Sequence, residues 1–166
     1  MAEEKSKHTL INNYIDPLAF RSIRDTLTGN TFYWFYNDFV NYGPCEGYKF
    51  TNEIVKNSNL TNTVFINYLN MVKPLLDKIN TKTVHSVRFN LFTKTLEPQK
   101  YMINHHKKNS KVAILFSNNT NGGIEIDDTF IKSTENQLVC FDSSIKYKVV
   151  TPTDSKIFTY VVVNYE

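Results

Sequence analysis

The chain has 166 residues, the size of one domain with a single sizeable core. Hydrophobic residues make up 41% of the sequence and aromatic residues 14%, which excludes a low-complexity disordered chain. Nineteen Lys and Arg residues against 16 Asp and Glu leave a net charge of +3, too small to indicate a nucleic-acid partner.

The ends and the cysteines indicate the compartment. The first eight residues are polar and charged, unlike a secretory signal peptide, and no apolar run approaches the ~20 residues that span a bilayer. Cys45 and Cys140 lie far apart and form no Cys-x-x-Cys pair, which favours reduced, buried thiols, although a single disulfide stays open. We expect a soluble protein that is not secreted and has no membrane partner.

The first helix is expected to begin at Asp16-Pro17, a capping acceptor followed by proline at the first helical position, and to end at Gly29. Four apolar residues share one face of this helix: Leu18, Ala19, Ile23 and Leu27. The aromatic run at residues 32–36 is predicted to pack between the helices and a sheet. A stacking platform for bases or sugars is the alternative.

A second helix is predicted over residues 61–79, where eight apolar residues follow helical spacing. Pro74 lies inside this segment and predicts a kink, and Asn80 ends it. The intervening residues 37–47 contain Gly43-Pro44 and Gly47, which is typical of a loop.

From residue 83 onward, side chains alternate between apolar and polar, the pattern of pleated strands. Six further strands are expected at residues 111–117, 124–127, 129–131, 137–141, 146–151 and 157–164. Helices followed by many short strands predict an α+β fold: a jelly roll with two N-terminal helices packed on one sheet. We expect a single domain, 1–166, in which 1–82 form mainly helical and loop support and 83–166 form the jelly-roll core.

Seven short segments carry a resemblance to a known family: Phe-Tyr-Trp-Phe-Tyr-Asn (32–37), Lys-Pro-Leu-Leu-Asp-Lys-Ile-Asn (73–80), Arg-Phe-Asn-Leu (88–91), Asn-Gly-Gly-Ile-Glu (121–125), Glu-Asn-Gln-Leu-Val-Cys-Phe-Asp-Ser (135–143), Thr-Asp (153–154) and Asn-Tyr (164–165). In order and approximate spacing they resemble the small phage-encoded 2-oxoglutarate/Fe(II) oxygenases, a branch of the prolyl-hydroxylase-like proteins. The resemblance implies a double-stranded β-helix.

Oxygenases of this family hold Fe(II) with a His-x-Asp pair and a distal His, and an Arg about ten residues further on binds the far carboxylate of 2-oxoglutarate. On this chain the His-x-Asp positions match Asn104-His105-His106, or His105-His106-Lys107 after a one-residue shift. The distal His position matches Tyr147, and the Arg position matches Ile157. The resemblance therefore implies the family's framework without its metal and co-substrate residues.

Other residues could take the place of the family's metal ligands and of its anion-binding Arg. Adjacent histidines on a strand face opposite sides, so His105 and His106 chelate one ion only if the backbone bends there. Glu125 or Asp142 would have to supply the missing carboxylate. Three lysines are possible substitutes for the anion-binding Arg: Lys146, Lys148 and Lys156.

These observations favour a degenerate, catalytically inactive oxygenase-like protein that serves as a binding or structural module and needs no cofactor. The expected partner is a protein, such as a component of a phage virion or its assembly, which places the chain in the host cytoplasm or the virion. One alternative is an active dioxygenase that uses Fe(II) and 2-oxoglutarate with unorthodox ligands. Another is a metal-free, cupin-like binder of a small molecule.

Overall fold

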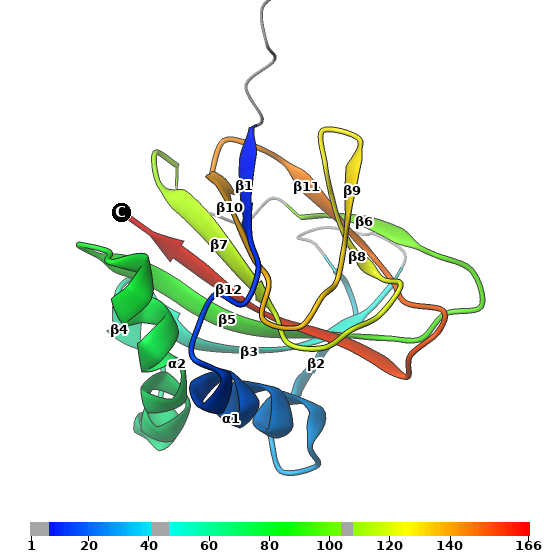
Figure 1. The fold of residues 1–166 in the computed structure, drawn as a ribbon. Helices are drawn as coiled ribbons and strands as arrows, with labels where there is room; N and C mark the ends of the chain where they lie inside the picture. Colours follow the sequence, from blue (N-terminus) through cyan, green and yellow to red (C-terminus); the bar gives the residue numbers. More distant parts are fainter. Residues whose placement is uncertain (1–6, 41–46, 104–107) are drawn as a thin grey trace, which may run out of the picture.

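The computed structural model describes residues 7–40, 47–103 and 108–166. Within these ranges the chain forms two α-helices and two antiparallel sheets (Figure 1). The two helices lie on one side of the larger sheet, and the smaller sheet lies on its other side. This is the predicted α+β arrangement: a double-stranded β-helix with N-terminal helices packed on one sheet.

Helix α1 (Pro17–Thr28) begins as predicted, because the Asp16 carboxylate accepts hydrogen bonds from the backbone N–H groups of Leu18 and Ala19. The predicted apolar face is partly wrong. Leu18 is 73% exposed, and Phe20 is buried beside the expected Ile23 and Leu27.

The second predicted helix is confirmed as a short 3-10 helix (Thr63–Phe65) that continues into α2 (Ile66–Ile79). The Asn62 side chain caps this segment by accepting a hydrogen bond from the backbone of Val64. Asn80 ends α2 in the left-handed conformation, at φ 55°, a conformation that asparagine tolerates well.

The described residues form twelve strands: β1 (His8–Ile11), β2 (Phe35–Asn37), β3 (Lys49–Lys56), β4 (Asn59–Leu60), β5 (Val84–Thr93), β6 (Lys100–Ile103), β7 (Lys111–Phe116), β8 (Gly123–Ile126), β9 (Thr129–Lys132), β10 (Leu138–Asp142), β11 (Tyr147–Val150) and β12 (Ile157–Tyr165). All seven predicted strands are present. Five strands were not predicted: β1 to β4, which add to the two helices expected in the first 82 residues, and β6, which pairs with β11 in the smaller sheet. Strand β3 pairs with β5 and extends the larger sheet.

The larger sheet has the order β1-β10-β7-β12-β5-β3-β2, with β4 paired to β3, and the smaller sheet has the order β6-β11-β8-β9. Consecutive strands from β5 onward therefore alternate between the sheets, except for the hairpin of β8 and β9. Asp127 and Asp128 connect that hairpin with φ values of 46° and 61°, the left-handed pair that a two-residue turn requires.

Two apolar clusters follow from this layering. Buried residues of α1 and α2 pack on one face of the larger sheet, against Val87, Phe89 and Val161 among others. The second cluster lies between the sheets and is rich in aromatic rings, among them Phe92, Phe116 and Phe158. Because strand residues alternate between faces, membership of these clusters shows which side chains point into the space between the sheets.

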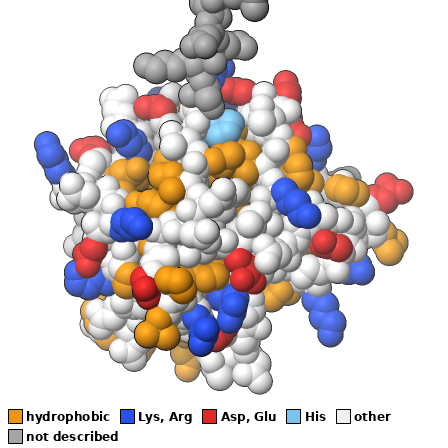
Figure 2. Space-filling model, viewed as in Figure 1, with side chains coloured by type: hydrophobic (Ala, Val, Ile, Leu, Met, Phe, Trp, Pro, Cys, Tyr) orange, Lys and Arg blue, Asp and Glu red, His pale blue; other side chains and the backbone are white. Residues whose placement is uncertain are grey.

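The surface carries mixed charge. On the face shown in Figure 2, basic and acidic side chains are interspersed with hydrophobic ones, and neither sign forms an extended patch. Neither helix of the described ranges is long and apolar enough to cross a membrane.

Candidate functional site

The family's metal positions fall where β6 ends and β11 begins. Tyr147, the first residue of β11, pairs with Ile103, the last residue of β6, and on its other side with Ile126 of β8. Asn104, His105, His106 and Lys107 lie outside the described residues. Tyr147 is thus the one family metal position that the structure locates, and it faces the space between the sheets.

Tyr147 packs there as a core residue. Its side chain is 1% exposed, and its ring lies 5.4 Å from the ring of Phe141 in an edge-on arrangement. Burial raises the pKa of Tyr147 above its ordinary value. The nearby charge of Arg88 and a hydrogen bond with Tyr160 lower this pKa, but by less than burial raises it. Burial also raises the pKa of Tyr160. A phenol in this setting stays protonated, and a protonated phenol is a poor ligand for Fe(II).

The position that matches the family's Arg lies at the start of β12. Ile157 is half-buried and pairs with Thr93, outside the inter-sheet cluster. Its neighbour Phe158 points inward and is fully buried, with its ring 5.1 Å from that of Tyr160 and 5.9 Å from that of Phe116. An aromatic ring, which cannot bind a carboxylate, therefore occupies the inward-facing place beside Ile157.

The lysines proposed as substitutes lie in three different settings. Lys148 points away from the inter-sheet space, and its ammonium lies 2.8 Å from the Glu125 carboxylate. Lys156 is exposed in the turn before β12. Lys146 is exposed and lines a surface cavity just before β11. None of the three belongs to the inter-sheet cluster, whose members are apolar or aromatic.

The two carboxylates proposed as ligands also point away from Tyr147. Glu125 is held between Lys100 and Lys148 on the outer face of the smaller sheet, and its hydrogen bonds with these lysines, Lys100 foremost, lower its pKa. Asp142 is exposed at the end of β10 and accepts a hydrogen bond of 2.8 Å from the Ser144 backbone. Hydrogen bonding by Ser144, from its side chain foremost and then from its backbone, lowers the pKa of Asp142. Pleating places both side chains on the opposite face from the inter-sheet cluster.

The sequence interpretation missed an ion pair in the inter-sheet space. Arg88 of β5 pairs in register with Val162, a member of the inter-sheet cluster, and so points toward that space. Its guanidinium lies 2.7 Å from the Glu53 carboxylate of β3, and both side chains are about one-fifth exposed, at 19% and 21%. The sequence did show that Arg88 lies at one of the polar positions that alternate along β5. Only the pairing of β5 with β3 shows that its partner is Glu53.

Some segments that carry the family resemblance have structural roles. The Asn121 backbone N–H donates to the Asp154 carboxylate at 3.0 Å, and the Asn121 side chain bonds the Thr153 hydroxyl at 2.7 Å. Asn136 holds the chain before α1 through two side-chain bonds to the backbone of Ile15, at 2.8 and 3.0 Å. These contacts join loops and strands that are distant in sequence, and they explain how the segments specify the fold.

The aromatic run at residues 32–36 divides in two. Phe32 is buried and Trp34 packs partly buried against the helix-side cluster, as predicted. Tyr33, Phe35 and Tyr36 are instead 52–64% exposed. The pairing of β2 with β3 at the edge of the larger sheet explains the difference, since an edge strand covers only part of its side chains.

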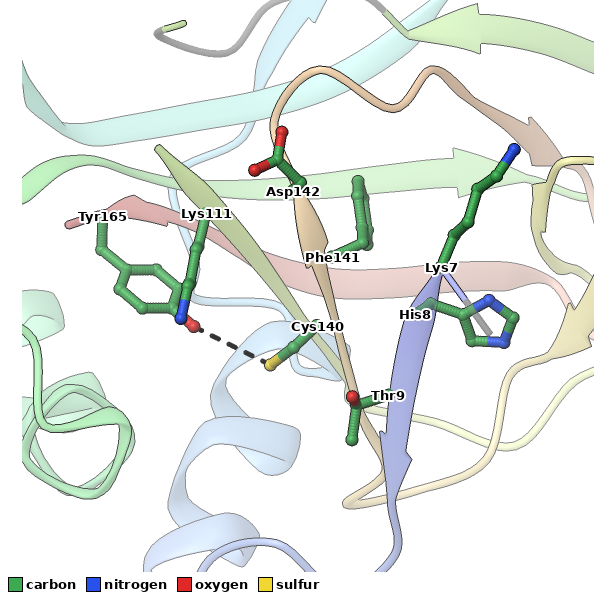
Figure 3. Close-up of a pocket in the computed structure, with 8 residues that line it drawn as sticks. All are labelled: Lys7, His8, Thr9, Lys111, Cys140, Phe141, Asp142 and Tyr165. Carbon is green, nitrogen blue, oxygen red and sulfur yellow. Dashed lines mark hydrogen bonds between the residues drawn. The ribbon is translucent and has the colours of Figure 1, made fainter. Parts of the chain in front are cut away.

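A second cavity, of about 230 Å³, lies where β1, β7, β10 and β12 meet (Figure 3). His8, Cys140 and Asp142 line it, but their side chains point in different directions. Cys140 lies 4.0 Å from the Tyr165 hydroxyl, and burial raises the pKa of its thiol. Among the described residues, no three His, Cys, Asp or Glu side chains converge as a metal site would require.

The described residues therefore do not fit the cofactors of the family. The one family metal position that they include holds a buried phenol, and the inward place beside the Arg position holds a phenyl ring. Of the two carboxylates considered, Glu125 is bound by two lysines, and Asp142 lies on the face of β10 opposite to the inter-sheet cluster.

No protein-family model matches the sequence, and no curated protein matches it either. Solved structures do match. A 2-oxoglutarate/Fe(II) oxygenase-family oxidoreductase from Burkholderia pseudomallei superposes with a TM-score of 0.67 over 98% of this chain and 86% of its own, at 10% sequence identity.

Two prolyl hydroxylases are similar to this chain over nearly its whole length. The enzyme from Pseudomonas putida has a TM-score of 0.58, at 10% identity, over 98% of this chain and 93% of its own. The enzyme from Trichoplax adhaerens was solved with a hypoxia-inducible-factor peptide. It has a TM-score of 0.59, at 10% identity, over 97% of this chain and 84% of its own. At such low identity these similarities establish the fold alone. The chain has the double-stranded β-helix fold of the 2-oxoglutarate/Fe(II) oxygenases.

Proposed function

We propose that this chain is an oxygenase-like double-stranded β-helix that works as a binding or structural module without oxygenase catalysis. The observation that carries the proposal is the packing at the family's site positions. Tyr147, Tyr160 and Phe158 are each no more than 1% exposed and fill the space between the sheets. A 2-oxoglutarate oxygenase needs open coordination positions there for its metal and co-substrate.

The partner that we propose is a protein. The resemblance to phage-encoded proteins makes a virion or assembly component the first candidate, with the virion or the host cytoplasm as its place. A net charge of only +3, with mixed charge on the face shown in Figure 2, gives little support for nucleic acid, which binds to extended basic surfaces.

An anaerobic titration tests the loss of catalysis. Metal-stripped protein is titrated with Fe(II), alone and with 2-oxoglutarate, by calorimetry and by visible absorption, and succinate formation is then measured in air. We expect no stoichiometric Fe(II) binding, no charge-transfer band and no succinate. Tight one-to-one binding with the band would overturn the proposal and support the active dioxygenase.

A matched variant locates the metal if binding is found. The double change His105→Ala and His106→Ala removes the two imidazoles at the family positions without altering Tyr147. Loss of Fe(II) binding in this variant would assign the metal to those histidines. Unchanged binding would place the metal elsewhere and leave the proposed loss of the family site standing.

The ion pair of Arg88 and Glu53 favours a second candidate, a metal-free binder of a small anion. Arg88 points toward the inter-sheet space, and its side chain remains 19% exposed. Calorimetry with small dicarboxylates would detect such a ligand, and Arg88→Gln should abolish the heat of binding. Absence of binding would leave the pair with a purely structural role.

A further inference from the structure

A cavity larger than that of Figure 3 adjoins the end of the inter-sheet space, between residues 108–109 and residues 143–146 of the turn that joins β10 to β11. Its volume is about 450 Å³, within the roughly 300–1,000 Å³ range of small-molecule sites. Lys108 lies on one side and Lys146 on the other, and Ile103 and Ile145 supply apolar wall. The cavity thus combines two cations with an apolar surface.

Hydrogen bonds hold the two loops together. The Ser143 backbone N–H donates to the Ser110 carbonyl at 2.9 Å, and the Ser110 N–H donates to the Ser143 hydroxyl oxygen at 3.1 Å. The buried Asn164 amide of β12 donates to the Ser110 hydroxyl at 2.6 Å and anchors this link in the larger sheet. Lys108 and Lys146 are therefore attached to loops of fixed spacing, which lowers the entropic cost of binding.

Both lysines are uncommitted within the described part of the chain. Neither has an ion pair or a hydrogen bond there, whereas Lys148, two residues further on, is bound to Glu125. The nearest acidic residue in sequence, Asp142, does not line this cavity. Asp142 lines the cavity of Figure 3 and bonds Ser144. Among the residues that the structure describes, the charge lining this cavity is therefore positive.

We propose that this cavity binds the phosphate group of a small phosphorylated molecule. Two ammonium groups match the charge of a phosphate dianion, and the Ser143 hydroxyl can donate a hydrogen bond to it. The volume exceeds that of phosphate alone, and the apolar wall of Ile103 and Ile145 suits the rest of the molecule.

Calorimetry and amide chemical shifts test the site. The full chain is titrated with inorganic phosphate and with glycerol 3-phosphate, and glycerol serves as the uncharged control. We expect saturable binding of both anions, with shifts at Asn109 and residues 143–146, and no response to glycerol. Tighter binding of the ester than of phosphate would indicate that contacts beyond the phosphate group contribute.

The variant Lys108→Ala with Lys146→Ala should weaken binding at least about tenfold. The control Lys132→Ala with Lys156→Ala removes the same charge from two exposed lysines outside the cavity and should change affinity less than about twofold. Equal weakening in both variants would show attraction to net charge and overturn the site. Absence of saturable phosphate binding in the unaltered chain would also overturn it.

Discussion

Phe158→Ala tests whether the space between the sheets is solid or hollow. The Phe158 ring is fully buried among aromatic neighbours, 5.1 Å from Tyr160 and 5.9 Å from Phe116. Removing a buried phenyl ring forfeits its transfer free energy and leaves a cavity, which together cost about 3–5 kcal/mol. We expect the free energy of unfolding, measured with urea by circular dichroism and fluorescence, to fall by this amount.

Ile157→Ala is the matched control, because it changes the adjacent residue on the opposite face of β12. Ile157 is only half-buried, so its truncation should cost about 1 kcal/mol. In thermal unfolding a protein of this size loses about 2–4 °C per kcal/mol, so the two variants should separate clearly. A larger loss for Ile157→Ala than for Phe158→Ala would refute the assigned register. Losses near 1 kcal/mol for both would refute a filled interior.

Three further predictions concern ionisable groups. Lys100 and Lys148 lower the pKa of Glu125 in the folded protein below its ordinary value of 4.5. The charged Glu125 therefore stabilises the fold fully above pH 4.5, and this stabilisation is lost as the pH falls through the folded-state pKa. In urea unfolding, Glu125→Gln should be less stable than the parent at pH 7, and the difference should shrink on acidification. Tyr147→Phe should cost about 1–2 kcal/mol, because the Tyr160 hydroxyl loses a buried partner. In an alkaline absorbance titration the parent should retain at least two tyrosines that ionise only on unfolding, and equal ionisation of all ten near pH 10 would contradict this.

The helices and the later strands could be predicted because their signals are local. Capping by Asp16 and the αL stop at Asn80 involve residues close in sequence. The alternation from residue 83 onward directly reflects burial on two faces. Strands β1, β3 and β6 were missed because they pair with strands far along the chain, and β2 and β4 were missed because they are short strands that pair only with β3. Strand β1, for example, pairs Thr9 with Cys140.

The candidate site shows the same limit. The resemblance placed Tyr147 and Ile157 at family positions, and both residues begin strands in the structure. Sequence reasoning offered Glu125 and Lys148 as substitutes without knowing that they face outward and bind each other. The orientation of Arg88 toward the inter-sheet space could not be read from composition, because it depends on which face of β5 the smaller sheet covers.

The sequence by itself determined the fold class, the two helices, seven of the strands from residue 84 onward, and the absence of imidazole and guanidinium at two family positions. These follow from periodicity, capping and residue identity, which are properties of short stretches of chain. Only the tertiary structure decided that Phe158 rather than Ile157 points inward, and that Lys108 and Lys146 line one cavity. A shift of one residue in strand register reverses every side chain, and two loops distant in sequence meet only after the sheets have formed.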